Sequence, residues 1–123
     1  MGTGLPDRDD ALVLLHNPRC SKSRAAHALL CERGVSFVER RYLEEPLSRA
    51  ELTALRERLA RPAAEWVRSG EAAYAEAGLD TSSGDVAILD AMAAHPILIE
   101  RPIFVRGARA VVGRPPESIL TLL

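Results

Sequence analysis

The sequence predicts an α/β domain: a four-stranded mixed sheet with a helical insertion between the second and third strands. Short apolar runs typical of strands stand at 11–15, 35–43 and 103–112. Helical patterns lie between them, including a block of several helices at about 48–95. The order is therefore β-α-β, an all-helical block, and then β-β-α. We expect residues 11–123 to form a single domain after a disordered lead-in over residues 1–10.

The first β-α-β segment begins with a wholly apolar run. Residues 11–15 read Ala-Leu-Val-Leu-Leu, which is too uniformly apolar for an exposed edge strand. A helix is expected over residues 21–33. The second strand is expected within 35–43, with Phe37 and Val38 at its centre.

Helix-start signals divide the insertion. Ser48 followed by Glu51 has the spacing of a capping box, and it opens a helix with Leu52, Leu55 and Leu59 on one face. Pro62 suits the first turn of a second helix, expected to carry Trp66, Val67 and Arg68. A short helix is expected over 71–77. The last helix of the block presents Val86, Leu89, Met92 and Ala93 before His95-Pro96 ends it.

The last segment is a hairpin followed by a helix. Residues 103–105 and 110–112 predict two short strands, and residues 106–109 between them predict the turn. Prolines at 115 and 116 open the final helix. This element order matches a thioredoxin-like (glutaredoxin-like) core.

Cys20 is the residue that most strongly suggests chemistry. It stands where the first strand gives way to the first helix, within His16-Asn17-Pro18-Arg19-Cys20-Ser21-Lys22-Ser23-Arg24. The N-terminus of a helix stabilises a thiolate and also binds oxyanions. The neighbouring cations also stabilise a thiolate. Ser21 is a candidate helix cap, and Ser23 is a candidate hydrogen-bond donor to the thiolate or to a bound anion.

Cys31 is not a partner for Cys20. The two cysteines lie eleven positions apart in one expected helix, which places their Cα atoms about 16 Å apart. A disulfide needs roughly 4.4–6.8 Å. Ser23 also stands where a Cys-x-x-Cys motif has its second cysteine, so a resolving thiol must come from another molecule. No Cys/His spacing resembles a zinc site.

Composition and sequence pattern limit the expected binding partners and cellular compartment. The net charge of −1 gives no support for binding nucleic acid, and no apolar stretch approaches the ~20 residues of a membrane span. The first ten residues lack the apolar core of a signal peptide. Two cysteines without such a signal favour the reducing cytoplasm.

At this point the sequence resembles the arsenate reductase (ArsC) family of the glutathione- and glutaredoxin-coupled type. The resemblance rests on the Cys20 motif above and on three further motifs spread over nearly the whole chain. These are Tyr42-Leu43-Glu44-Glu45-Pro46, His95-Pro96-Ile97-Leu98-Ile99-Glu100-Arg101-Pro102-Ile103 and Gly113-Arg114-Pro115. The loop sequence Arg-Cys-Ser-Lys-Ser is similar to that of one branch of the family, whose members are usually named arsenate reductases from sequence similarity only.

The resemblance implies a set of roles. Cys20 is the implied nucleophile toward arsenate, and three arginines hold the oxyanion: Arg68, Arg101 and Arg114. His16 and Ser23 are implied supporting residues, and Arg101-Pro102 stands where the fold has a cis-proline. Guanidinium groups suit a tetrahedral oxyanion because their paired N–H groups bind it in charge-assisted fashion.

The resemblance also implies the co-substrate and partners. Glutathione and glutaredoxin supply the electrons, arsenite is the product of an arsenic detoxification reaction, and neither a metal nor a tightly bound cofactor is needed. Two other functions remain open. One is a monothiol oxidoreductase acting on glutathione mixed disulfides. The other is a regulatory protein similar to the Spx regulators, which bind RNA polymerase but typically carry Cys-x-x-Cys.

Overall fold

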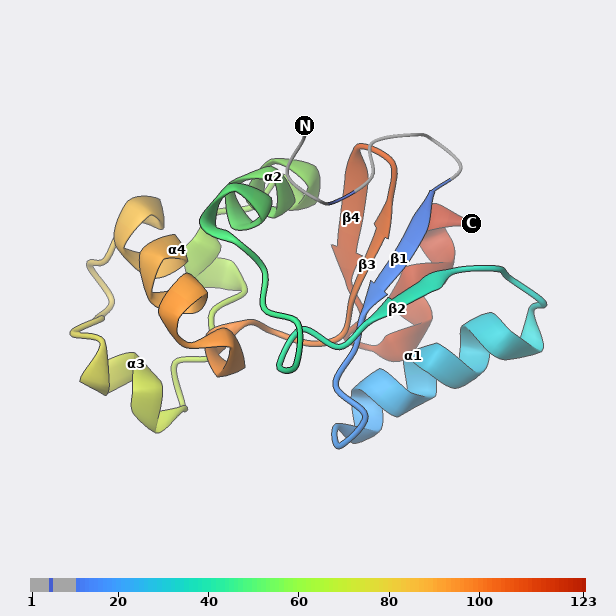
Figure 1. Cartoon of the computed structure of the whole chain (residues 1–123), viewed down its shortest axis with the longest axis horizontal. Helices are drawn as coiled ribbons and strands as arrows, with labels where there is room; N and C mark the ends of the chain where they lie inside the picture. Colours follow the sequence, from blue (N-terminus) through green and yellow to red (C-terminus); the bar gives the residue numbers. More distant parts are fainter. Residues whose placement is uncertain (1–4, 6–10) are drawn as a thin grey trace.

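The computed structural model describes Leu5 and residues 11–123, and its centre is the predicted four-stranded mixed sheet (Figure 1). The strands are β1 (Leu12–Leu15), β2 (Val38–Arg40), β3 (Ile103–Arg106) and β4 (Arg109–Val112). They lie in the order β2-β1-β3-β4. β1 is parallel to β2, whereas the β1–β3 and β3–β4 pairs are antiparallel. The α/β fold class is confirmed.

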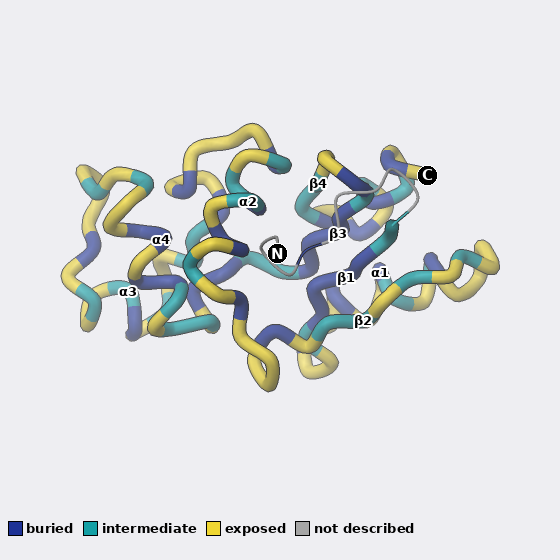
Figure 2. Tube along the Cα trace, turned by 45° about the horizontal axis from the view of Figure 1, so that its top comes forward, coloured by how far each residue is buried: buried dark blue, intermediate teal, exposed yellow. Residues whose placement is uncertain are grey.

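Alternating side chains of the central strands serve two different cores. Leu14 and Phe104 point to the face covered by α1 (Ser21–Glu32) and by the C-terminal 3₁₀ helix η3 (Pro116–Leu122). Val13 and Leu15 point to the other face and join the core of the insertion. Figure 2 shows that burial is concentrated in β1 and β3, while the edge strand β2 is half-buried to exposed.

The helical insertion lies beside the sheet, between β2 and β3 in the chain (Figure 1). It contains α2 (Arg49–Leu59), η1 (Ala63–Glu65), α3 (Ala72–Glu76), α4 (Asp85–Ala94) and η2 (Pro96–Leu98). The capping box is confirmed, since Ser48 accepts a hydrogen bond from the Glu51 N–H and the Glu51 side chain accepts one from the Ser48 N–H. Among the described residues, none of the helices is both long enough and apolar enough to cross a membrane.

The helix predicted after Pro62 is wrong beyond its first turn. Only η1 forms, and Trp66 and Val67 leave helical geometry. Val67 makes an antiparallel bridge with Ile99, and the Arg68 N–H donates to the Leu98 carbonyl at 2.7 Å. The buried indole of Trp66 and this pairing with a distant segment satisfy the backbone, so tertiary contacts override the helical start signal.

Three smaller predictions also need correction. Phe37 lies before β2 rather than in its centre, and Val38 is 62% exposed because β2 is an edge strand. Val86 is 69% exposed, whereas Ile88 and Ala91 are buried, because α4 is apolar on several sides and its sequence does not single out one face. The final helix is of the 3₁₀ type.

The expectation for residues 1–10 lies outside the described residues, apart from Leu5. Leu5 is buried in the core that the insertion shares with the sheet.

Candidate active site at the start of helix α1

Cys20 occupies the N-cap position of α1. Its backbone is extended, its carbonyl accepts the Arg24 N–H at 2.9 Å, and its own N–H donates to the Asn17 carbonyl at 3.0 Å. The side chain is 8% exposed, and the thiol is not in a disulfide. The sulfur is thus held against the positive end of the helix, as the sequence predicted.

Ser23 fixes the loop that carries Cys20. Its buried hydroxyl lies 2.6 Å from His16 Nδ1 and accepts a hydrogen bond from the Asn17 N–H at 3.0 Å. Asn17 in turn accepts the Arg19 N–H through Oδ1 at 3.0 Å. These bonds engage the Ser23 hydroxyl within the loop, whereas the sequence suggested that it donates to the thiolate or to a bound anion. Ser21 is exposed and makes no cap hydrogen bond, because Cys20 itself is the N-cap residue.

The guanidinium group that reaches the sulfur comes from the far end of the chain. Nη2 of Arg114 lies 4.0 Å from Cys20 Sγ, and Nε donates to the Arg101 carbonyl at 2.9 Å. By contrast, Arg19, Lys22 and Arg24, the cations beside Cys20 in sequence, are exposed. The Arg24 guanidinium donates to the Pro18 carbonyl at 3.0 Å.

Close backbone packing places Arg114. The Gly113 N–H donates to the Pro102 carbonyl at 2.8 Å, and a Cβ on Gly113 would come within 2.7 Å of Pro102 Cγ. Only glycine leaves room for this approach. The Arg101-Pro102 bond is cis, as the resemblance implied, and the Arg114-Pro115 bond is also cis.

Arg101 presents donors that the protein does not use. Its Nε and Nη1 atoms are buried and have no hydrogen-bond partner among the described residues. Buried polar groups are almost always paired, and a buried guanidinium left partly unpaired is costly. Such donors suit an anionic ligand.

The Glu100 carboxylate links Arg68 to Arg114. Its Oε1 lies 3.1 Å from Arg114 Nε and 3.8 Å from Arg68 Nε. Arg68 also pairs with Glu71 at 2.7 Å. Arg68 and Arg114 therefore share one carboxylate, and Arg101 is joined to Arg114 through its backbone carbonyl. Glu100 was not predicted as a site residue, although it directly precedes Arg101 in a matching motif.

Tyr42 is a second residue that sequence reasoning did not select. It is 1% exposed, and its hydroxyl is hydrogen-bonded to the Asn17 side chain. Burial raises the pKa of Tyr42 well above its usual range, and the nearby charge of Cys20 adds to this, while Arg68 opposes it. Tyr42 is thus a neutral phenol close to the sulfur. Its only signal in the sequence was its place in the Tyr42–Pro46 motif.

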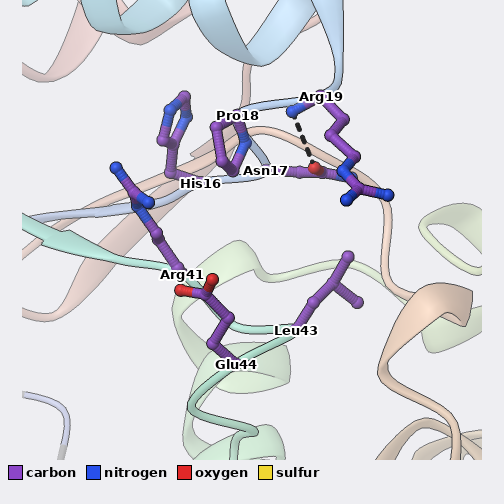
Figure 3. Close-up of a pocket in the computed structure, with 7 residues that line it drawn as sticks. All are labelled: His16, Asn17, Pro18, Arg19, Arg41, Leu43 and Glu44. Carbon is purple, nitrogen blue, oxygen red and sulfur yellow. Dashed lines mark hydrogen bonds between the residues drawn. The ribbon is translucent and has the colours of Figure 1, made fainter.

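A cavity of about 250 Å³ opens beside the loop that leads to Cys20 (Figure 3). His16, Asn17, Pro18 and Arg19 line it from the loop, and Arg41, Leu43 and Glu44 line it from the segment after β2. Figure 3 places Arg19 and Arg41 on opposite sides of the space, with Glu44 near Arg41. The lining therefore carries both signs of charge.

The sheet and the position of Cys20 define a class. A four-stranded mixed sheet with a single cysteine at the start of its first helix is a thioredoxin-like domain without a second cysteine in the helical turn. Within that class the chain belongs to the ArsC family, whose model matches residues 15–122.

Known proteins of similar sequence and structure support this family assignment. An arsenate reductase of Neisseria meningitidis is 44% identical over 114 residues, covering 91% of this chain and 97% of that protein. The uncharacterized protein YfgD of Escherichia coli is 43% identical, covering 89% of this chain and 94% of that protein. The solved structure of an arsenate reductase from Vibrio cholerae superposes with a TM-score of 0.86 at 43% identity, covering 92% of this chain and 98% of that one.

Proposed function

We propose that this protein is an arsenate reductase that uses Cys20 as its nucleophile and glutathione and glutaredoxin as its electron donors. In the overall reaction, one arsenate and two thiols give arsenite, one disulfide and water. Arsenic(V) gains two electrons, and the two thiol sulfurs lose them. Family membership and the similarity to proteins named arsenate reductase support the substrate.

The observation that carries the proposal is a thiol with a guanidinium beside it, and that guanidinium is bonded to the backbone of an arginine whose buried donors lack an acceptor. Cys20 Sγ lies 4.0 Å from Arg114 Nη2, and the same guanidinium binds the carbonyl of Arg101. Arg101 in turn holds two buried donors without a partner. A tetrahedral oxyanion bound there would have its arsenic atom next to the sulfur and its negative charge on guanidinium groups.

The residues then act in a simple order. The Cys20 thiolate attacks arsenic, an oxygen leaves as water, and Arg101 and Arg114 neutralise the charge on the remaining oxygens. Arg68 contributes to the same field and is kept in place by Glu71 and Glu100. Glutathione next attacks the arsenic of the adduct and a second oxygen leaves as water. The glutaredoxin thiolate then attacks the glutathione sulfur, which forms the mixed disulfide and leaves arsenic(III) on Cys20. Water hydrolyses the remaining arsenic–sulfur bond, which releases arsenite and the Cys20 thiol.

The need for an external thiol follows from the cysteine count. Cys31 is exposed, on the same helix and eleven positions from Cys20, and both cysteines are free. The cavity beside the loop has room for part of a small peptide, and its arginines suit the carboxylates of glutathione (Figure 3). The proposed setting is the cytoplasm, where glutathione keeps thiols reduced.

The test is direct measurement of arsenite formed from arsenate, with glutathione alone, with glutathione plus glutaredoxin, and with a thioredoxin system. We expect turnover only when glutathione and glutaredoxin are both present. Equal turnover with thioredoxin alone would reject the proposed donor but keep the substrate. No arsenite under any condition would reject the substrate.

A second candidate is a monothiol oxidoreductase acting on glutathione mixed disulfides. The observation in its favour is that a thioredoxin-like domain presents one buried, non-disulfide cysteine at its first helix. Release of glutathione from a mixed disulfide without any dependence on arsenate, at a rate that Cys20→Ser abolishes, would favour this function.

A further inference from the structure

Two histidines and a glutamate meet at the β2 edge of the sheet. His16 follows β1, His27 lies on α1 and Glu39 lies in β2. One ligating atom from each lies within 4.8 Å of the others. His16 is buried, and the other two are half-buried. These residues stand on three separate elements, which is why no Cys/His spacing in the sequence predicted a site.

The fold itself assembles this cluster. β1 and β2 are parallel neighbours with Leu14 opposite Glu39, and the His16 N–H donates to the Arg40 carbonyl at 2.8 Å. The ring centroids of His16 and His27 are 5.0 Å apart. His27 Nε2 lies 2.9 Å from Glu39 Oε1.

Each of the three side chains also has a partner outside the cluster. His16 Nδ1 is taken by Ser23 Oγ at 2.6 Å, which leaves Nε2 for a ligand. His27 Nδ1 contacts Cys31 Sγ at 3.7 Å, so its Nε2 faces Glu39. The other oxygen of Glu39 binds Arg41. Metal-binding histidines and carboxylates characteristically have such outer partners, which fix the ring orientation and the tautomer.

We propose that His16, His27 and Glu39 bind a divalent transition-metal ion of the zinc class. Two imidazoles and one carboxylate are the ligands of open zinc sites, which keep a fourth position for water. Imidazole ligands favour zinc and its neighbours over magnesium or calcium, which prefer oxygen. Ligand atoms around tetrahedral zinc lie roughly 3.3 Å apart, given bonds of about 2.0–2.1 Å. The half-buried His27 and Glu39 have the freedom to close that distance.

The proposed site shares His16 with the candidate active site but takes neither Cys20 nor Arg68, Arg101 or Arg114 as a ligand. It is nevertheless linked to Cys20. His16 is bonded to Ser23, and Ser23 holds the loop that ends at Cys20. An ion on His16 would therefore brace the turn that positions the nucleophile.

The experiment is calorimetric titration of the full-length chain with Zn²⁺, and with Co²⁺ as a spectroscopic probe, in a Cys20→Ser background that removes the active-site thiol. The variants are His27→Gln and Glu39→Gln. His95→Gln is the matched control, since His95 ends α4 and lies outside the cluster. Thermal unfolding with and without Zn²⁺ provides a second readout, because an ion that binds only the folded state raises Tm.

We expect one Zn²⁺ per chain, a rise in Tm on adding Zn²⁺, and tetrahedral-type Co²⁺ absorption. Affinity should fall at least 10-fold in His27→Gln and in Glu39→Gln and stay within 2-fold in His95→Gln. Absence of binding, or equal affinity in Glu39→Gln, would overturn the proposal. A loss in Cys31→Ser that exceeds the loss in Glu39→Gln would overturn it as well, since it would place the ion on the His27–Cys31 pair. If His27→Gln fails to fold, the test rests on Glu39→Gln, which keeps the size of the side chain.

Discussion

Replacing Arg101 with methionine should remove oxyanion binding without weakening the fold. Nε and Nη1 of Arg101 are buried and have no partner among the described residues, so the free protein gains nothing from these two donors. Methionine keeps an unbranched apolar side chain that fills the same space. The substitution therefore separates the role of Arg101 in binding from any role in packing.

The magnitude follows from the two donors. A hydrogen bond to a charged group contributes about 1.5–3 kcal/mol, so losing two costs about 3–6 kcal/mol of binding free energy. That corresponds to roughly 10²- to 10⁴-fold weaker arsenate binding. In the free protein the substitution should not reduce stability, because an unpaired buried donor is itself unfavourable. The Tm of Arg101→Met without anion should be equal to or above that of the wild type.

The assay is thermal unfolding with and without arsenate, together with titration calorimetry. Arsenate should raise the Tm of the wild type and of Arg109→Met, a control at an exposed arginine in β4, but not that of Arg101→Met. Arsenate affinity within 3-fold of wild type in Arg101→Met, or a drop in its Tm without anion, would refute the reasoning.

Three further outcomes are expected. Hydrogen bonds from Arg40 and Ser48 outweigh burial and hold the pKa of Glu51 below its usual range; the resulting stability is present at neutral pH and is lost as pH falls through that lowered pKa. Glu51→Gln should therefore cost about 3 kcal/mol in urea unfolding at pH 7, with the difference from wild type shrinking in acid. Gly113→Ala should cost about 1–3 kcal/mol because its Cβ would meet Pro102, and arsenate turnover should fall by more than the unfolded fraction explains. Arg114→Met should slow alkylation of the Cys20 thiol by iodoacetamide at neutral pH, because it removes the cation 4.0 Å from the sulfur and a cation beside a thiol favours the reactive thiolate form; an unchanged rate would exclude that role.

Much of the fold could be predicted because its local signals agree with its tertiary contacts. The apolar run at 11–15 becomes the central strand β1, and the capping box at Ser48 and Glu51 begins α2. The prediction failed where a distant segment decided the backbone. Val67 pairs with Ile99 instead of continuing a helix, and no local pattern announces that bridge.

The sequence could propose candidate site residues but not their contacts. The Cys20 motif and the family resemblance predict Cys20 as the nucleophile and three arginines as its anion-binding partners. The sequence left open whether the adjacent cations Arg19 and Lys22 face the sulfur, and the structure brings Arg114 to it from 94 positions away. Glu100 and Tyr42 were missed because a carboxylate among arginines and a buried phenol become informative only once their neighbours are known.

The most direct measurement is arsenate-dependent NADPH oxidation by wild type, Cys20→Ser and Cys31→Ser, coupled through glutathione, glutaredoxin and glutathione reductase. If Cys20 carries the reaction, Cys20→Ser has no arsenate-dependent rate, and Cys31→Ser retains that of the wild type. Turnover that survives in Cys20→Ser, or is lost only in Cys31→Ser, would contradict the assignment of Cys20 as the nucleophile.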